Sequence, residues 1–523
     1  MNQIQIDRSA ESLASASAPM LTRRRFGKIV LGLGALGLIE PQTVVRALET
    51  NHRRLSWLAY RTAEREGAWE LPDVEGQIPV DLEGTLYRVA PGQSENHGVT
   101  LRHFFDGDTF LTAFSFRDGK LGIRTRFLDL PERLKELEAG RMLYSEFGTL
   151  APPSPDGKPV PGIRSKNQPN VNVVAWDGRL LGLSEGGHPT AIDPHDLSYQ
   201  KRWDFHGTLP RSVPFTAHPK FDEETGVGYG YGVSQGFKLS LNVYRMELDG
   251  RLTLLHSVPQ MGYCMVHDMM LTKQHLVFAI PPVRFDLPTL FAGKMAVAEA
   301  VRYFENEPMR FLILRRDGTG EPITIDQPAG MVFHHGNAHE RDGKLVVDSI
   351  LSEGDSALTL LNSWADESLP EVSPPTVTRI VFDLATARAE SRTQVSVDQE
   401  FPRFDTRRTG EDARYLYTGE STLPEDPFVS TRIVKHDLHR GESTSVGEQK
   451  GRAYGESVFV PRAGSRDEDD GWLLAQGYDA VRDENFLEIR DAGSLDLAAR
   501  SWTATHFPLG FHGNFVQKPD AAT

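Results

Sequence analysis

The sequence predicts an all-β protein, either an array of β-sandwiches or a β-propeller. Asp-Gly pairs recur between short apolar runs, as at residues 177–178 between residues 171–175 and 180–183. An Asp-Gly pair between such runs is a strong signal for a β-hairpin. Extended helical periodicity is scarce, and the best helices are predicted over residues 131–140 and 296–305. No repeat of fixed length is visible, so the blades of a propeller would have diverged in sequence.

The N-terminal segment has the organisation of a signal peptide. Arg24 and Arg25 precede an apolar run over residues 29–39, and a small-residue cleavage site ends at Ala47. Paired arginines before a mildly hydrophobic, glycine-rich run are typical of the twin-arginine (Tat) export route. The run is too short for a membrane span, which takes about 20 residues. We therefore predict a Tat signal peptide over residues 1–47, with the Tat translocon as a partner and the periplasm as the destination.

Residues 48–523 are expected to form one domain, because no long low-complexity linker divides them. The net charge is −15, from 72 acidic and 57 basic side chains. This balance argues against nucleic-acid binding, which depends on basic patches. Cys264 is the chain's only cysteine, so no intramolecular disulfide can form. The stability of the protein must therefore come from core packing.

Four of the 17 histidines stand in unusual contexts: His218 in Thr-Ala-His-Pro, His267 in His-Asp-Met, His334 in Phe-His-His-Gly and His512 in Gly-Phe-His-Gly. Neutral imidazole is a common ligand of zinc, iron, copper and nickel. In a propeller, each blade directs its inner strand at one axis, so one histidine per blade could meet its counterparts at a single point. Strand alternation turns the neighbouring His335 to the opposite face, so we expect His334 to be the ligand.

Further motifs accompany these histidines between residues 73 and 515. They are Leu-Glu-Gly-Thr-Leu-Tyr-Arg at 82–88, His-Phe-Phe-Asp-Gly-Asp at 103–108, Lys-Asn at 166–167, Leu-Ser-Glu-Gly-Gly at 183–187, Glu-Phe-Pro at 400–402 and Glu-Ser-Val-Phe-Val-Pro at 456–461. In this order the motifs resemble the carotenoid cleavage oxygenase family, in particular its bacterial apocarotenoid oxygenases. The resemblance implies a seven-bladed β-propeller with one Fe(II) on its axis and a cap of loops and short helices over a substrate tunnel. It also implies cleavage of a conjugated C=C bond of a carotenoid or apocarotenoid by O2 into two carbonyl products.

The resemblance also implies a set of metal ligands and supporting residues. Four neutral imidazoles would leave up to two positions of the metal open, unlike a closed structural zinc site. They would also leave its charge uncompensated, so carboxylates that accept the imidazole Nδ1–H are expected. By the resemblance the ligands are His218, His267, His334 and His512, with Glu185 supporting His267, Glu400 supporting His334, Glu456 supporting His512, and no carboxylate at His218. No residue is expected to act as a nucleophile or general base.

The substrate tunnel is expected to be apolar. By the resemblance its wall includes Tyr263, Met265, Met269, Phe333, Phe401 and Ser184. Ser184 stands where relatives often carry an aromatic residue, and the two methionines replace aromatic residues near the second ligand. Because thioether side chains adapt to irregular shapes, we infer a wider, more plastic and less aromatic pocket near iron. The alternative is that both methionines are ordinary core residues.

The apolar segment from Phe285 to Phe291 is expected either to contact a membrane at the tunnel mouth or to be a buried loop.

The nearest alternative activity is that of a stilbene-cleaving dioxygenase. That branch looks to recognise a phenol with a lysine after an Arg-x-Arg-Phe strand, but residues 124–127 here are followed by Leu-Asp-Leu. A propeller that binds an apolar ligand without catalysis is the alternative of a different class. Isomerisation without oxygen also stays open.

Overall fold

The computed structural model describes residues 54–154, 165–234, 239–259, 265–291, 293 and 295–517. The described residues, apart from residues 481–483, form one compact unit. The predicted signal peptide and Tyr263 lie outside the described residues. Within the described ranges, no helix is long and apolar enough to span a bilayer.

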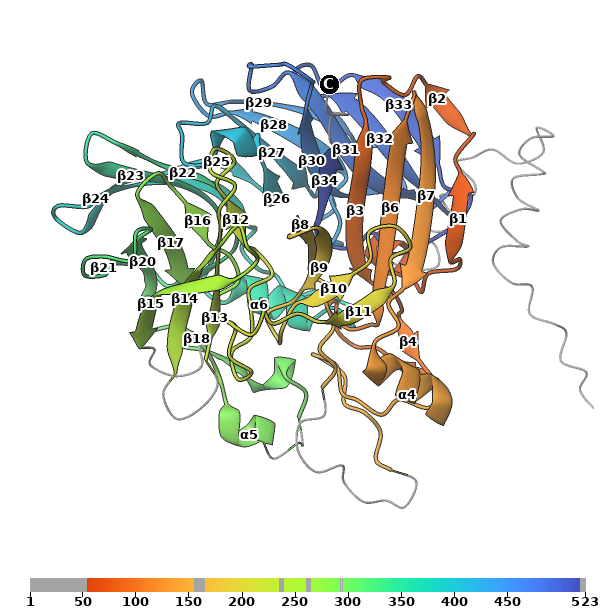
Figure 1. Ribbon diagram of the computed structural model, residues 1–523, viewed down its shortest axis with the longest axis horizontal. Helices are drawn as coiled ribbons and strands as arrows, with labels where there is room; N and C mark the ends of the chain where they lie inside the picture. The colour runs from red at the N-terminus through yellow and green to blue at the C-terminus, as the bar shows by residue number, and fades with distance from the viewer. Residues whose placement is uncertain are drawn as a thin grey trace, which may run out of the picture. The chain divides into compact units, whose positions relative to one another are not determined.

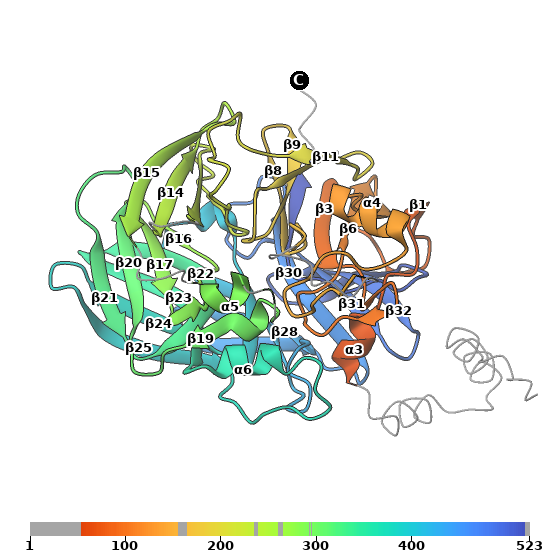
Figure 2. The same cartoon turned by 90° about the horizontal axis from the view of Figure 1, so that it is seen from below.

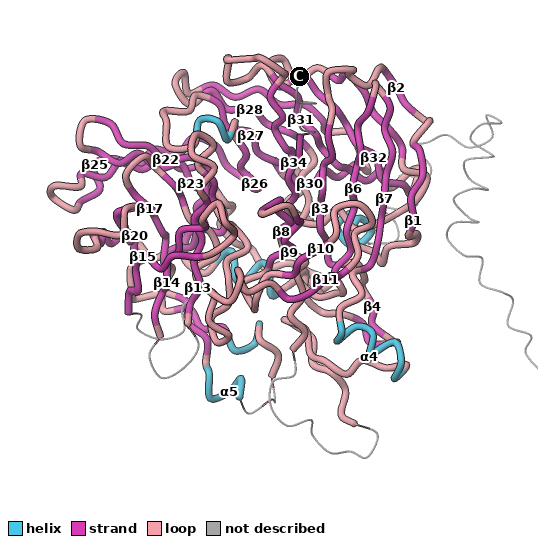
Figure 3. Tube along the Cα trace, viewed as in Figure 1, coloured by secondary structure: helices cyan, strands magenta, loops and turns pink. Residues whose placement is uncertain are grey.

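Antiparallel sheets of four or five strands surround a central axis, and the described strands make seven of them (Figure 1). Strands dominate the structure, and the helices are few and short (Figure 3). Neighbouring inner strands pack against one another, as β16 does against β22 and β30 against β34. The fold is a seven-bladed β-propeller, as the sequence predicts.

The first three blades, each from its inner to its outer strand, have the following bounds. The first contains β34 (Gly513–Gln517), β3 (Gly84–Pro91), β6 (Thr109–Arg117), β7 (Lys120–Phe127) and β1 (Gly67–Glu70). The second contains β8 (Asn172–Trp176), β9 (Arg179–Leu183), β10 (Thr190–Ile192) and β11 (Tyr199–Arg202). The third contains β12 (Lys220–Phe221), β13 (Gly228–Val233), β14 (Ser240–Met246) and β15 (Leu252–Pro259).

The remaining blades follow in chain order. The fourth contains β16 (Met270–Leu271), β17 (His275–Ile280), β20 (Met309–Arg315) and β21 (Ile323–Gln327). The fifth contains β22 (Gly330–Arg341), β23 (Lys344–Glu353), β24 (Thr376–Asp383) and β25 (Arg388–Val397). The sixth contains β26 (Gln399–Arg403), β27 (Tyr415–Glu420), β28 (Arg432–Asp437) and β29 (Glu442–Gly447). The seventh contains β30 (Arg452–Pro461), β31 (Gly471–Asp479), β32 (Glu484–Asp491), β33 (Leu497–Trp502) and β2 (Val74–Gly76).

Two strand pairings close the ring. The C-terminal strand β34 pairs with β3 as the innermost strand of the first blade. The N-terminal strand β2 pairs with β33 as the outermost strand of the last blade. Apolar side chains then fill the space between these two blades, where Phe114 and Leu86 pack in one cluster with Leu474 and Leu487. Closure and this packing stabilise the propeller without a disulfide.

A cap of hairpins and short helices lies on one side of the ring, as Figure 2 shows from below. Its elements are α3 (Leu55–Ala59), β4 (Glu95–Asn96), β5 (Val99–Thr100), α4 (Pro131–Ala139), β18 (Val283–Phe285), α5 (Leu287–Phe291), η1 (Ala298–Ala300), β19 (Val301–Tyr303) and α6 (Ser356–Asn362). A 3-10 turn, η2 (Thr406–Arg408), precedes β27. The predicted cap of loops and short helices is therefore present.

The predicted turns and one predicted helix are confirmed, and the other predicted helix is wrong. The Asp-Gly turns at residues 118–119, 177–178 and 342–343 join paired strands, and both residues of each turn have positive φ. This is the geometry that a tight hairpin turn requires. The helix predicted over 131–140 is confirmed as α4. The helix predicted over 296–305 is wrong, because only η1 forms there and Val301–Tyr303 pairs with β18 as a strand. Pairing of these β-branched and aromatic residues outweighs a weak helical pattern.

Candidate metal centre and its cavity

The four singled-out histidines meet at one point on the propeller axis. His218 precedes β12, His267 precedes β16, His334 lies within β22, and His512 directly precedes β34. One ring nitrogen of each lies within 4.8 Å of the corresponding atoms of the other three. Four separate blades thus contribute one imidazole each from the end or middle of an inner strand.

Irregularities in the inner strands direct these side chains inward. The pairing register shifts around His334 on β22, at Glu400 on β26 and at Glu456 on β30. Such β-bulges re-aim a side chain that regular alternation would place elsewhere. Phe401, next to Glu400, has φ +54°, a left-handed conformation that is unusual for a bulky residue within a strand.

The segment that carries His512 requires its flanking glycines. Gly510 has φ +71°, and a Cβ there would lie 2.4 Å from the carbonyl oxygen of Val89. A Cβ on Gly513 would lie 2.4 Å from the carbonyl oxygen of Tyr87. Only glycine lets this segment approach β3 so closely. The Gly-Phe-His-Gly motif therefore encodes the position of the imidazole as well as its identity.

The spacing of the imidazole nitrogens fits a metal ion. Nε2 of His334 lies 3.3 Å from Nε2 of His267 and 3.0 Å from Nε2 of His512, and His218 Nε2 lies 3.2 Å from His267 Nε2. Metal–nitrogen bonds of about 2.1 Å place two ligands about 3.0 Å apart at right angles and about 3.4 Å apart at tetrahedral angles. The observed distances run from the right-angle value at 3.0 Å towards the tetrahedral value at 3.3 Å, so all three are compatible with ligands of one metal ion.

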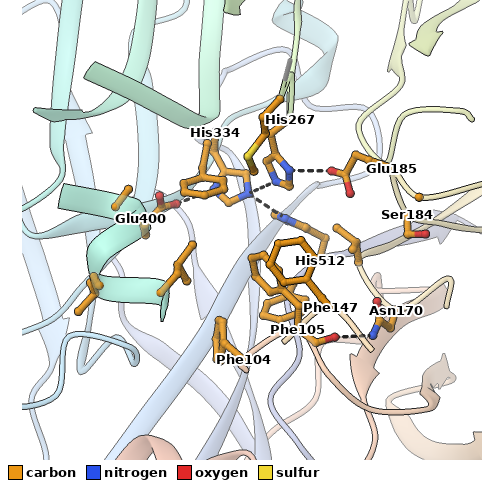
Figure 4. Close-up of a pocket in the computed structure, with 18 of the residues that line it drawn as sticks. Phe104, Phe105, Phe147, Asn170, Ser184, Glu185, His267, His334, Glu400 and His512 are labelled. Carbon is orange, nitrogen blue, oxygen red and sulfur yellow. Dashed lines mark hydrogen bonds and ion pairs between the residues drawn. The ribbon is translucent and has the colours of Figure 1, made fainter. Parts of the chain in front are cut away.

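Three glutamates hold three of the imidazoles by their other nitrogen, and Figure 4 shows two of these pairs, Glu185 with His267 and Glu400 with His334. Glu185 lies 2.6 Å from Nδ1 of His267, Glu400 lies 2.6 Å from Nδ1 of His334, and Glu456 lies 2.9 Å from Nδ1 of His512. A carboxylate at Nδ1 keeps the proton there and leaves the Nε2 lone pair for a metal. Within the described part of the chain, no carboxylate pairs with His218. Lone pairs that converge at 3.0 to 3.3 Å would repel one another without a cation between them.

The three glutamates differ in their surroundings. The side chains of Glu185 and Glu400 are about one third exposed, at 33% and 31%, and both face the cavity. Glu456 is 1% exposed and lies 3.8 Å from Arg88 and 3.5 Å from Arg403. Burial alone would raise the pKa of Glu456, but Arg403 and His512 lower it to about 2.

Arg88 also joins the two inner strands that carry this pair. Its guanidinium donates to the carbonyl oxygens of Glu456 and Phe511, at 3.1 and 3.2 Å. Glu456 in turn accepts a hydrogen bond from the backbone N–H of Gly513. The His512 ligand is therefore held by a network of buried charges, whereas His334 depends on Glu400 at the cavity surface.

A cavity of about 950 Å³ opens onto the metal centre. His267, His334 and His512 form part of its wall, and α5 and α6 contribute Leu290 and Leu361. Phenylalanine is the recurrent lining residue, at positions 104, 105, 147, 215, 285, 333, 401, 428 and 511. Figure 4 shows Phe105 and Phe147 beside His512. A cavity of this size and lining can enclose an apolar molecule beside the three imidazoles that form part of its wall.

The predicted lining residues divide into two groups. Ser184, Met265, Phe333 and Phe401 line the cavity. Met269 does not, because it is fully buried in a core cluster with Tyr231 and Phe278 between two blades. Aromatic rings also lie close to the imidazoles. The ring centroids of Phe333 and His267 are 5.2 Å apart, and those of Phe401 and His334 are 5.4 Å apart. The prediction of a less aromatic wall therefore rests on Ser184 and Met265 alone.

Comparison with known proteins identifies the family to which the chain belongs. The family model described as retinal pigment epithelial membrane protein, RPE65, matches residues 60–517. The chain belongs to the carotenoid oxygenase family. It is 32% identical over 472 residues to apocarotenoid-15,15'-oxygenase of Synechocystis, covering 88% of this chain and 96% of that protein. It is 28% identical to resveratrol cleavage oxygenase 1 of Aspergillus fumigatus, covering 87% and 94%.

A solved structure described as cobalt-substituted Synechocystis ACO matches the fold with a TM-score of 0.81 and 30% identity, over 89% of this chain and 98% of that one. The match covers nearly all of that structure, so the chain has the propeller architecture of a carotenoid oxygenase. Cobalt substitution implies a metal in that relative, which agrees with the donor set found on the axis here.

Some residues of this carotenoid oxygenase centre were not singled out from the sequence. Lys220 lies 2.7 Å from Asp268, which also accepts the backbone N–H of His335 at 2.9 Å. This ion pair joins the segments of His218, His267 and His334. Lys220 and Asp268 directly neighbour the ligand motifs, and Arg88 ends the Leu-Glu-Gly-Thr-Leu-Tyr-Arg motif. The signal that could have identified these residues is the presence of a charged side chain within or beside each ligand motif.

Proposed function

We propose that this protein is a non-haem Fe(II) dioxygenase that cleaves a conjugated C=C bond of a carotenoid or apocarotenoid with O2, giving two carbonyl products. The observation that carries the proposal is the convergence of four Nε2 atoms at the wall of a large apolar cavity. Four neutral nitrogen donors with open positions suit Fe(II) better than a closed structural zinc site. Bound Fe(II) would supply the coordination positions and the redox chemistry that O2 requires.

The remaining contributions come from the chain itself. Glu185, Glu400 and Glu456 orient three imidazoles and keep their protons at Nδ1. Phe333 and Phe401 place flat apolar surfaces beside His267 and His334, where they would hold a polyene against the centre. The apolar wall excludes water from the reacting bond.

The proposal is tested with protein loaded with Fe(II) and offered apocarotenals, intact carotenoids and stilbenes, with products identified by mass. We expect an apocarotenal to yield two carbonyl fragments, and chelation of the metal to abolish cleavage until Fe(II) is restored. Cleavage of stilbenes alone would favour the phenylpropanoid alternative. Iron-loaded protein that consumes none of the compounds would instead favour a binding propeller, and rearranged product without O2 uptake would favour an isomerase.

We also propose that the cap side, including the segment from Phe285 to Phe291, contacts a membrane, where polyenes reside. Exposed leucines gather on α4, where Leu134 and Leu137 are 48% and 50% exposed. In Figure 1, α4 and α5 project on the same side of the ring. Replacing Leu134 and Leu137 by serine is expected to lower liposome association, whereas Leu248→Ser, at a 69% exposed leucine between β14 and β15, should not. Equal association of all three proteins would contradict the proposal.

We further propose export to the periplasm through the Tat translocon, on the basis of the N-terminal arginine pair and the apolar run that follows it. Replacement of Arg24 and Arg25 by lysine is expected to retain the full-length chain in the cytoplasm. Cell fractionation measures this directly, and periplasmic recovery of the variant would argue against the route.

A further inference from the structure

A buried ion cluster forms part of the cavity wall. The Lys166 ammonium, whose side chain is fully buried, lies 2.7 Å from Asp108, 2.9 Å from Glu136 and 2.8 Å from Glu146. An ammonium group has three N–H donors. Two of them donate hydrogen bonds to Asp108 and Glu136, whereas Glu146 lies within ion-pair distance but its buried Oε1 accepts no hydrogen bond.

Two of these carboxylates have further partners inside the protein. Glu136 also accepts hydrogen bonds from Asn96 Nδ2 and from the backbone N–H groups of Leu143 and Tyr144. Asp108 accepts from the amides of Gln168 and Gln93. Neither carboxylate lines the cavity. Their bonding is complete without a ligand, so we regard both as structural.

Glu146 differs from them in both respects. It lines the cavity, its side chain is 3% exposed, and within the described ranges Lys166 is its sole charged partner. A carboxylate offers about four acceptor positions, so most of the acceptor capacity of Glu146 is unused. Burial, together with Asp106 and Asp108 nearby, raises the pKa of Glu146 to about 7 against the opposing effect of Lys166. A polar group that is buried and incompletely bonded thus faces a predominantly apolar chamber.

We propose that Glu146 recognises a hydroxyl group at one end of the elongated substrate, an inference that rests on the proposed function. A hydroxyl can donate to the free acceptor positions of Glu146 or accept from its protonated form, whereas a hydrocarbon end can do neither. A hydrocarbon end placed there would leave those positions of Glu146 without a hydrogen bond, which is costly. The preferred substrate is therefore a hydroxylated apocarotenoid or carotenoid, and Glu146 is a residue that determines specificity.

The test compares two ligands and four proteins. The ligands are an apocarotenal that bears a ring hydroxyl and the same apocarotenal without it. The proteins are the Fe(II)-loaded wild type and the variants Glu146→Leu, Glu146→Gln and Glu136→Gln. For each pair, kcat/KM is measured by product formation, and Kd by the absorption shift of the polyene on binding.

The wild type is expected to favour the hydroxylated compound by about tenfold, as one charge-assisted hydrogen bond provides, mainly through KM and Kd. Glu146→Leu should reduce this ratio to about one while still cleaving the compound without the hydroxyl, and Glu146→Gln should give an intermediate ratio. Glu136→Gln is the matched control from the same cluster, and its ratio should equal that of the wild type even where its stability is lower.

The outcomes separate the two proposals. Equal ratios in the wild type and Glu146→Leu, with cleavage intact, would overturn the role of Glu146 and leave the dioxygenase proposal standing. A binding preference that depends on Glu146, without cleavage of either compound, would support the recognition site and overturn the dioxygenase. Absence of both binding and cleavage would overturn both.

Discussion

The His334→Ala variant is expected to lose its iron and, with it, all detectable cleavage. His334 is central in the cluster, with its Nε2 within 3.3 Å of Nε2 of both His267 and His512. Its loss also leaves Glu400, at 2.6 Å from Nδ1 in the wild type, without its imidazole partner. Iron content measured by elemental analysis and product formation should therefore fall together.

The neighbouring residue provides a matched control. His335 is buried and its Nδ1 lies 2.7 Å from the hydroxyl of Ser349, away from the other three imidazoles. His335→Asn is expected to reduce stability but to retain one iron per chain and measurable cleavage. If His335→Asn lost its iron while His334→Ala kept the wild-type iron content, the ligand would be His335 and not His334.

Glu400→Gln is expected to weaken iron binding by about 10- to 100-fold, the usual effect of removing a carboxylate behind a metal-bound histidine. Glutamine can still accept from Nδ1 of His334, but it lacks the charge that offsets a cation. Competition with a chelator of known affinity measures the change. Cleavage at saturating iron should recover in part, because the imidazole itself is still present.

Glu456→Gln should behave differently, since its wild-type carboxylate is buried between two arginines. Removing that charge leaves Arg88 buried without its counterion, which we expect to lower the free energy of unfolding by about 3 kcal/mol. Glu400→Gln should leave that free energy nearly unchanged, because the Glu400 side chain is 31% exposed to the cavity. Urea unfolding of the two metal-free variants distinguishes them, and equal losses of stability would contradict the difference described here.

Motif context predicted the part of this centre that depends on residue identity. The resemblance to the carotenoid cleavage oxygenases implied the four histidines and the pairing of each glutamate with its histidine, and the structure places every one of these pairs in contact. The hairpins at Asp-Gly turns were also predictable, because the turn geometry is local. These features need no knowledge of how the blades pack.

Features that depend on packing between blades were not predictable. Met269 is near a ligand in sequence, yet its side chain enters the core between two blades and not the cavity. The bulges at His334, Glu400 and Glu456 break the regular alternation from which facing residues are inferred. Glu146 lies in a segment without a recognisable motif, and its importance emerges only from the incomplete bonding around Lys166.

The most direct test of the central claim is anomalous diffraction at the iron absorption edge, from crystals of protein loaded with Fe(II) under anaerobic conditions. The expected result is one peak per chain, between the Nε2 atoms of His218, His267, His334 and His512. The absence of a peak at that point, or a peak at any other donor set, would contradict the assignment of the four histidines as the iron site.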